Sequence, residues 1–133
     1  MFIDTFAVST ERDKQVLDIT GYIEKHLSRW HFTDGLCNIF VRHTTAGITT
    51  GEAIEGTDED LMETLVKMIP SIRFRHGHDP AHAPDHMISS IVGASLSIPV
   101  SGGKLLLGTW QRVLLVECNG PRTREVVLTA ISA

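Results

Sequence analysis

Hydrophobic and polar residues alternate along the chain with two different periods, and each period predicts one type of secondary structure. Residues 2–8 alternate with period two, which predicts a first strand. From Asp18 a helix of about twelve residues is predicted, because one helical face carries the apolar residues Ile19, Ile23, Leu27 and Trp30. Asp34 and Gly35 predict a turn before the segment LCNIFVRH, a strand with Cys37, Ile39, Val41 and His43 on one face.

The middle of the chain predicts two further helices. The first begins near Thr57, which is expected to cap it together with Asp60 in a variant of the capping box. Its apolar face is predicted to consist of Leu61, Leu65, Met68 and Ile69, and the proline that follows ends the helix. Asp85 is expected to cap a short third helix, which runs through residue 91 and ends at Gly93.

The last third of the chain is predicted to be strands joined by turns. SLSIPV leads to a turn at residues 102–103, and KLLLGTWQRVLLVEC is expected to form one strand. After a turn at residues 119–121, TREVVLTAI forms the last strand. The order of elements predicts one domain over residues 1–133 with an α+β fold, mostly antiparallel β-sheets packed like a sandwich, and two to three helices.

Composition excludes several classes of function. The chain has 133 residues and a net charge of −4, so it lacks the basic surface expected of a nucleic-acid-binding protein. No apolar run approaches the roughly 20 residues of a membrane span, and the N-terminus does not resemble a signal peptide. Cys37 and Cys118 both lie in apolar runs, which suits two reduced, buried thiols and a cytoplasmic location.

Four of the seven histidines fall within the segment HGHDPAHAPDH, as His76, His78, His82 and His86. Such a cluster can bind a metal ion, bind an anionic substrate, or be a solvated loop. Imidazole is the commonest ligand of zinc, and a catalytic zinc site needs three protein ligands and one open position. The spacing matches neither a zinc finger nor the HExxH motif, so the pattern by itself leaves the three interpretations open.

A second group of candidate residues lies in HTTAGITTGE, which begins with His43. A histidine on an apolar strand face is usually structural, and threonines are common in strands. The threonine hydroxyls beside Gly47 and Gly51 can also line an anion pocket, and they belong to Thr44, Thr45, Thr49 and Thr50. Glu52 follows directly and is a candidate general base, although a single glutamate is normally solvated.

The segment LLLGTWQRVLLVEC raises two questions. Trp110 is expected in the core, on the same strand face as Leu106 and Leu114. Glu117 is then a carboxylate on a largely apolar face, which is costly unless it is paired. Arg122 or Arg124 can be its partner, and the same arginines can instead bind a phosphate group through two hydrogen bonds.

Together, HTTA, Glu52, the histidines at 76 and 86, the run IPV…GGKLLLGTWQ and the final NGPRTR resemble the YjbQ family over nearly the whole chain. The resemblance implies a homotrimer with a site at the subunit boundary. It also implies a metal site of His43, His76 and His86, with zinc as the expected divalent ion. His78 and His82 fall outside the motif. We further expect Glu52 and Gln111 to be catalytic, and Thr44, Thr45, Arg122 and Arg124 to bind the substrate.

The resemblance leads to three functional hypotheses. The first is a metal-dependent transferase like thiamine-phosphate synthase, which transfers a pyrimidine methyl group from its pyrophosphate to a thiazole phosphate. The second is a metal-dependent hydrolase of a small phosphate or carboxyl compound, with Glu52 as the base. The third is a trimeric protein that binds a metal or small molecule without catalysis. All three give the chain a small-molecule partner and no nucleic-acid or membrane partner.

Overall fold

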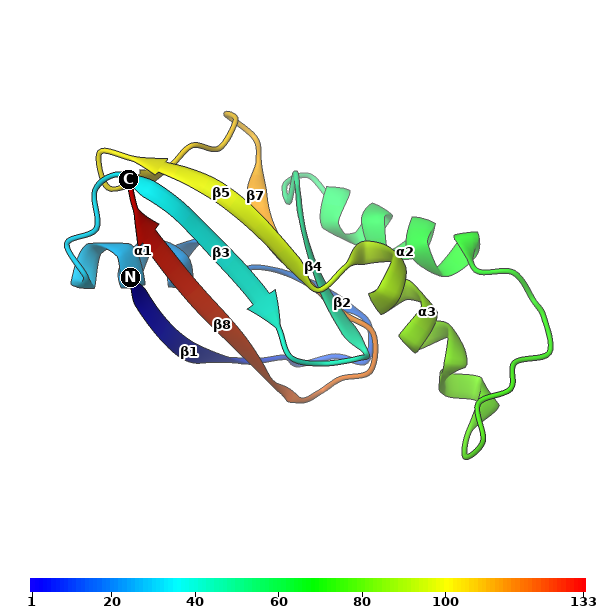
Figure 1. Cartoon of the computed structure of the whole chain (residues 1–133). Coiled ribbons are helices and arrows are strands. Elements are labelled where there is room, and N and C mark those ends of the chain that lie inside the picture. The colour runs from blue at the N-terminus through cyan, green and yellow to red at the C-terminus, as the bar shows by residue number, and fades with distance from the viewer.

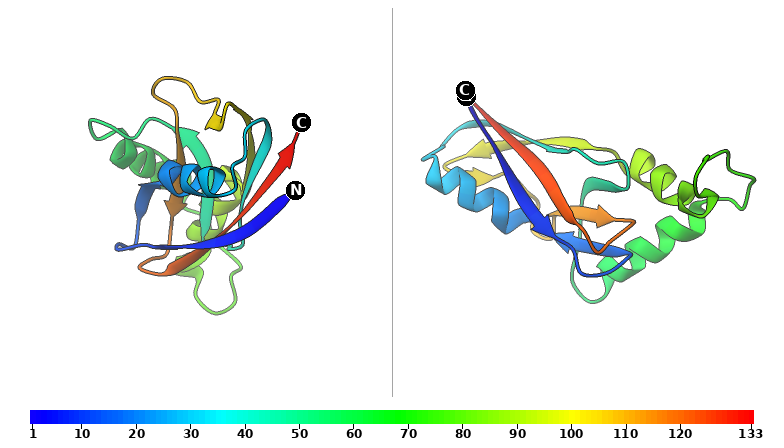
Figure 2. Two further views of the ribbon diagram at one scale, coloured as in Figure 1. Left: turned by 90° about the vertical axis from the view of Figure 1, so that its left-hand side faces the viewer. Right: turned by 90° about the horizontal axis from the view of Figure 1, so that it is seen from below.

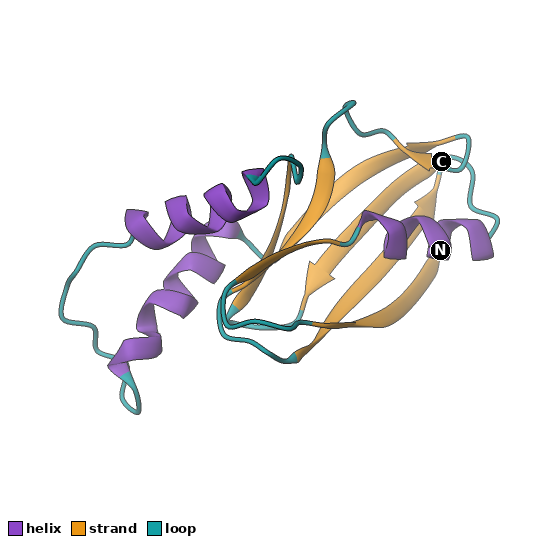
Figure 3. Ribbon diagram, turned by 180° about the vertical axis from the view of Figure 1, so that it is seen from behind, coloured by secondary structure: helices purple, strands orange, loops and turns teal.

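The computed structural model describes residues 1–133 as two antiparallel sheets, three α-helices and one short 3-10 helix. Both sheets and α1 (Thr20–Arg29) form one part, which we call the body (Figure 1). The remaining helices project from one end of the body and form a second part, the arm (Figure 3). None of the helices is both long and apolar enough to span a membrane.

The larger sheet has five strands in the order β1-β8-β3-β5-β6. Its strands are β1 (Phe2–Ser9), β3 (Gly35–Val41), β5 (Ser95–Ser101), β6 (Lys104–Leu105) and β8 (Thr123–Ser132). The first and last strands pair along their full common length, from Phe2 opposite Ala130 to Ser9 opposite Thr123. The predicted alternation is confirmed on β1 and β3, where Phe6, Val8 and Cys37 are buried.

The smaller sheet has the order β2-β7-β4, with β2 (Gln15–Asp18), β4 (Ala46–Gly51) and β7 (Arg112–Glu117). It packs with α1 against the inner face of the larger sheet, and Figure 2 shows this layering from two sides. A cluster of 19 buried residues fills the space between them. The stripe predicted for α1 supplies Ile19, Ile23 and Leu27 to this cluster, and all three are fully buried.

The arm consists of α2 (Thr57–Met68), the 3-10 helix η1 (Pro80–His82) and α3 (Ala83–Val92). It packs on the other face of the small sheet, where six buried residues form a second cluster: Val16, Met62, Ile88, Leu114, Val116 and Cys118. The central strand β7 is therefore buried on both of its faces. Much of the arm stays exposed, and Met68, predicted on the buried face of α2, is 61% exposed.

Both predicted helix caps are wrong. Gly56 is the N-cap of α2, with a positive φ of 79°, and the Thr57 hydroxyl donates to the Ile54 carbonyl instead (2.5 Å). Asp85 lies inside the first turn of α3, because helical structure already begins at Pro80, in η1. The cap of this earlier start is Asp79, whose carboxylate accepts from Ala81 N (3.0 Å), while the Asp85 carboxylate accepts a hydrogen bond from Lys14 (2.9 Å).

The long strand predicted over residues 104–118 is also wrong, because the chain leaves the larger sheet at Leu105 and enters the smaller one at Arg112. A turn between them is closed by hydrogen bonds between Gly108 and Gln111 in both directions, at 3.1 and 3.0 Å. Trp110 lies on this turn and is 65% exposed, so it is not a core residue.

Candidate functional site

A buried ion pair lies where β7 ends and β8 begins. Arg124 donates from Nε to both carboxylate oxygens of Glu117, at 2.9 and 3.1 Å, and its Nη2 donates to the same carboxylate. The Nη2 also donates to the Thr45 hydroxyl at 2.9 Å. Burial would raise the pKa of Glu117, but the hydrogen bonds from Arg124 and Thr10 outweigh it and hold the pKa below its ordinary value.

This arrangement decides between the two interpretations of the arginines. Arg124 is buried and its hydrogen bonds go to Glu117 and Thr45, so the structural interpretation holds for Arg124 and the predicted phosphate contact does not. Thr45 is likewise buried. Arg122 is exposed, and its side chain bonds only through Nε to the Asn119 carbonyl, at 2.8 Å. Thr44, which follows His43, is exposed as well. Both are therefore accessible to a substrate.

His43 lies just after β3, beside this ion pair. Its Nε2 accepts a hydrogen bond from the backbone N–H of Glu125 at 2.8 Å, so in the neutral ring Nδ1 carries the proton. Partial burial, and then the charge of Arg124, lower the pKa of His43. The lowered pKa favours the neutral ring, and His43 can bind a metal only after its nitrogen releases the Glu125 N–H.

The arm brings His76 and His86 together. Their rings stack with centroids 5.0 Å apart and an angle of 27° between the planes. They line an open pocket of about 380 Å³, together with Arg73, Phe74, Arg75 and Ala83. The Nδ1 of His76 accepts only a long hydrogen bond from Asp79 N (3.3 Å), which a stronger partner can replace.

His82 belongs to a separate polar network that attaches the arm to the body. Its ring contacts Asp79 at 3.2 Å and Asp85 at 3.0 Å, and Asp85 bonds Lys14. Lys14 also donates to the carbonyl of Cys118, at 2.5 Å. The hydrogen bond with Asp85 raises the pKa of His82. His78 is exposed and outside both groups.

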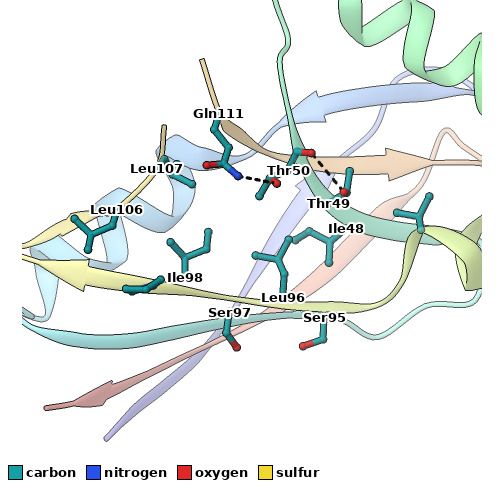
Figure 4. Close-up of a pocket in the computed structure, with 12 residues that line it drawn as sticks. Ile48, Thr49, Thr50, Ser95, Leu96, Ser97, Ile98, Leu106, Leu107 and Gln111 are labelled. Atoms are coloured by element: carbon teal, nitrogen blue, oxygen red, sulfur yellow. Dashed lines mark hydrogen bonds between the residues drawn. The ribbon is translucent and has the colours of Figure 1, made fainter. Parts of the chain in front are cut away.

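The two predicted catalytic residues lie at the far end of β4. Gln111 donates from Nε2 to the Thr50 hydroxyl at 3.0 Å and faces a cavity between β4 and β5 (Figure 4). Glu52 follows β4 and is exposed. At a strand rise of about 3.3 Å per residue, the two ends of β4 are roughly 16 Å apart. A single chain therefore keeps Gln111 and Glu52 away from Thr45 and His43.

One chain alone does not assemble the predicted metal site. No group of three or more His, Cys, Asp or Glu side chains could hold a metal ion. Of the three predicted ligands, only His76 and His86 are neighbours, on the arm, whereas His43 lies on the body.

Sequence reasoning missed Thr10 and Lys14. Thr10 donates to Glu117 at 2.7 Å and also receives the backbone N–H of Arg122. Both residues lie about a hundred positions from a main partner, so spacing carries no signal for either of them. The one sequence signal for this network was an acidic residue, Glu117, in an otherwise apolar strand, which indicated that Glu117 needs buried partners.

Comparison with known proteins gives a consistent result. The family model described as UPF0047 protein YjbQ-like matches residues 4–133. A UPF0047 protein of Mycobacterium tuberculosis is 41% identical over 96% of this chain and 95% of its own, and the Bacillus subtilis UPF0047 protein YugU is 36% identical over 92% and 93%.

Two solved structures share the fold over almost their whole length. The hypothetical protein APE1520 of Aeropyrum pernix K1 has a TM-score of 0.92 and 41% identity, with both chains fully covered. A YbjQ-like protein of unknown function from Sulfolobus solfataricus P2 has a TM-score of 0.91 and 34% identity, covering 99% of this chain and 97% of that one. The antiparallel α+β fold predicted from the sequence is confirmed.

Proposed function

Because the chain belongs to the YjbQ (UPF0047) family, we propose that it forms a homotrimeric, metal-dependent enzyme whose active site is completed between neighbouring subunits. The observation that carries this proposal is the separation of the site residues. His76 and His86 are paired on the arm, whereas His43 and Thr44 lie on the body. Each half is accessible and incomplete, as expected when one subunit's arm meets the next subunit's body.

The arm's surface supports this contact. Met68, Ile72 and Ile91 are 61%, 59% and 61% exposed, which is unfavourable in water unless another surface covers them. A contact between two different surfaces of the same chain is heterologous, and it closes into a ring when the rotation fits. A ring of three gives three equivalent sites, each with histidines from two subunits.

The reaction to test first is the transfer of a pyrimidine methyl group to a thiazole phosphate. In it the thiazole nitrogen forms a bond to the methylene carbon, the C–O bond to pyrophosphate breaks, and pyrophosphate leaves. A divalent metal such as zinc, held by His76, His86 and His43, would neutralise charge on that leaving group.

The chain's own residues have two further roles in this proposal. Arg122 and the arginines at 73 and 75 are exposed and can hold phosphate oxygens. The buried Glu117–Arg124 pair has a positioning role, since it fixes Thr45 and the start of β8, beside which His43 lies. The two buried thiols suit a reducing compartment such as the cytoplasm.

The experiment that tests the proposal mixes two inactive variants. His43→Ala removes the body half of the site and His86→Ala removes the arm half. Mixed trimers contain some sites with both halves intact, so zinc binding and pyrophosphate release should return in the mixture and be absent from each variant alone. His78→Ala is the matched control and should retain both properties. A monodisperse monomer in light scattering, or no recovery in the mixture, overturns the shared site.

A further inference from the structure

A cavity of about 350 Å³ lies between the edges of the two sheets (Figure 4). β4 forms one side, β5 forms the other, and the loop after β6 covers it with Leu106 and Leu107. None of the lining side chains is ionisable. A charged ligand would therefore lose its hydration there without gaining an opposite charge, so the cavity favours an uncharged one.

Both strands turn backbone groups that pair with no other strand towards this cavity, although the Thr50 carbonyl accepts a long hydrogen bond from the Thr49 hydroxyl (3.5 Å, Figure 4). β4 pairs only with β7, and β5 pairs with β6 only at Val100 and Ser101. Successive residues of an antiparallel strand direct their N–H and C=O groups to opposite sides. Ala94 bonds to Val41 on β3, so the backbone groups of Ser95 and Ser97 point the other way, towards β4. Thr45 likewise bonds to Cys118, so the backbone groups of Thr50, five residues on, point away from β7 and towards β5.

Side chains add two hydrogen-bonding groups. Thr50 accepts from Gln111 and keeps its own hydroxyl proton for another partner, and the Gln111 amide keeps one N–H. The hydroxyls of Ser95 and Ser97 point away from the cavity (Figure 4) and accept hydrogen bonds from Asn38 on the opposite face of the sheet. Leu96 and Ile98 supply the apolar wall.

The two ends of the gap are closed by hydrogen bonds between backbone groups. At one end Ile48 N donates to Gly93 O, and at the other Leu106 N donates to Pro99 O, both at 2.9 Å. An added β-strand would have to run past both ends, so the closure favours a compact molecule over an extended peptide.

We propose that this cavity binds a compact, uncharged nitrogen heterocycle whose edge carries an amino donor next to a ring acceptor. Such an edge matches the adjacent N–H and C=O groups of a strand, and the ring's faces suit the apolar wall. A volume of about 350 Å³ is at the small end of ligand pockets, which agrees with a single substituted ring. The ligand class is that of the pyrimidine in the proposed transfer, so the inference rests on that proposal for its ligand, and it adds a binding place that uses none of the histidines.

The test uses 4-aminopyrimidine as the probe, added to the full-length protein without metal. Backbone amide signals of Ser95, Ser97 and Thr50 should shift in NMR spectra during the titration. Thr50→Val keeps the side-chain shape but removes the hydroxyl, and Gln111→Leu removes the amide. Each should weaken binding about tenfold, which corresponds to one hydrogen bond. The probe 4-dimethylaminopyrimidine, without the amino donor, should bind about tenfold more weakly.

Controls separate this site from the histidine site. Ser97→Ala removes a hydroxyl that faces away, and His86→Ala removes a residue of the arm, so both should bind the probe as the unchanged chain does. The proposal is overturned if Thr50→Val binds equally well, if His86→Ala abolishes binding, or if inorganic phosphate shifts these amides more strongly than the heterocycle. It is also overturned if only a capped tetrapeptide shifts them, which indicates strand addition.

Discussion

The body encloses a hydrophobic cluster of 19 residues, whereas the arm contributes only Met62 and Ile88 to a cluster of six. Each part also has its own polar network. The pair of Glu117 and Arg124 in the body is buried, at 0% and 2% exposure, whereas the arm's Lys14–Asp85–His82 network reaches solvent at both ends. The body is thus stabilised by its own buried contacts, whereas the arm is stabilised mainly by its contact with the small sheet.

The largest effect should come from breaking the buried pair in the body. Arg124→Met leaves the Glu117 carboxylate buried with hydrogen bonds from Thr10 and a backbone N–H alone. We expect a loss of about 3–5 kcal/mol in the free energy of unfolding, measured by urea denaturation. Adding Glu117→Gln to this variant should restore part of the loss, since no unpaired charge then remains. A double variant less stable than Arg124→Met would contradict this account.

A pair of isoleucine substitutions compares the two parts directly. Ile39→Ala removes a fully buried side chain of the body cluster and should cost about 2–5 kcal/mol in unfolding free energy. Ile91 on the arm is 61% exposed, so Ile91→Ala should change the stability of an isolated chain little. In the proposed trimer it should instead raise the dissociation constant, which sedimentation at several protein concentrations measures. An unchanged dissociation constant would place Ile91 outside the interface.

The attachment of the arm should be weaker than the pair within the body. Lys14→Met leaves the buried carboxylate of Asp85 with His82 as its partner, at 3.0 Å, and removes the donor to the Cys118 carbonyl. We expect a loss of roughly 1–3 kcal/mol, concentrated in the arm. Amide hydrogen exchange should accelerate in α3 and hardly change in β3. Equal acceleration in both elements would show that arm and body open as one unit.

The smallest effect should be a pH dependence confined to the arm. The hydrogen bond with Asp85 raises the pKa of His82 above the unfolded value of about 6.5. The protonated ring therefore stabilises the arm fully below about pH 6.5, and this contribution disappears as pH rises through the folded-state pKa. Exchange protection of α3 should exceed that of His82→Gln at low pH and match it at high pH. A constant difference would exclude His82 as the titrating group.

Elements with a clear apolar period were predictable from sequence. The stripe of α1 and the alternation of β1 and β3 each depend on burying one face, so their residues carry the pattern. The caps at Thr57 and Asp85 were wrong, because Gly56 with its positive φ and Asp79 before Pro80 cap these helical segments instead. The core position of Trp110 was wrong because the chain changes sheets there, and such a change depends on tertiary contacts.

The candidate site was predictable only in part for a similar reason. The partner of Glu117 and the neighbourhood of His76 and His86 could be expected from residue types and from the family resemblance. The separation of His43 from His76 and His86 was not predictable, because it depends on how the arm is placed on the body. The cavity at Thr50 is built largely of backbone groups at strand edges, and backbone groups leave no residue signature.

The two cysteines sit one in each hydrophobic cluster. Cys37 is fully buried in the body cluster and Cys118 in the cluster beneath the arm, and burial raises the pKa of each thiol to about 12. Neither reacts as a thiolate while its surroundings stay closed. The two thiols therefore report separately on the opening of the two parts. The labelling rate of Cys118 by a thiol reagent records how often the arm lifts from the small sheet, and that of Cys37 records how often the body opens.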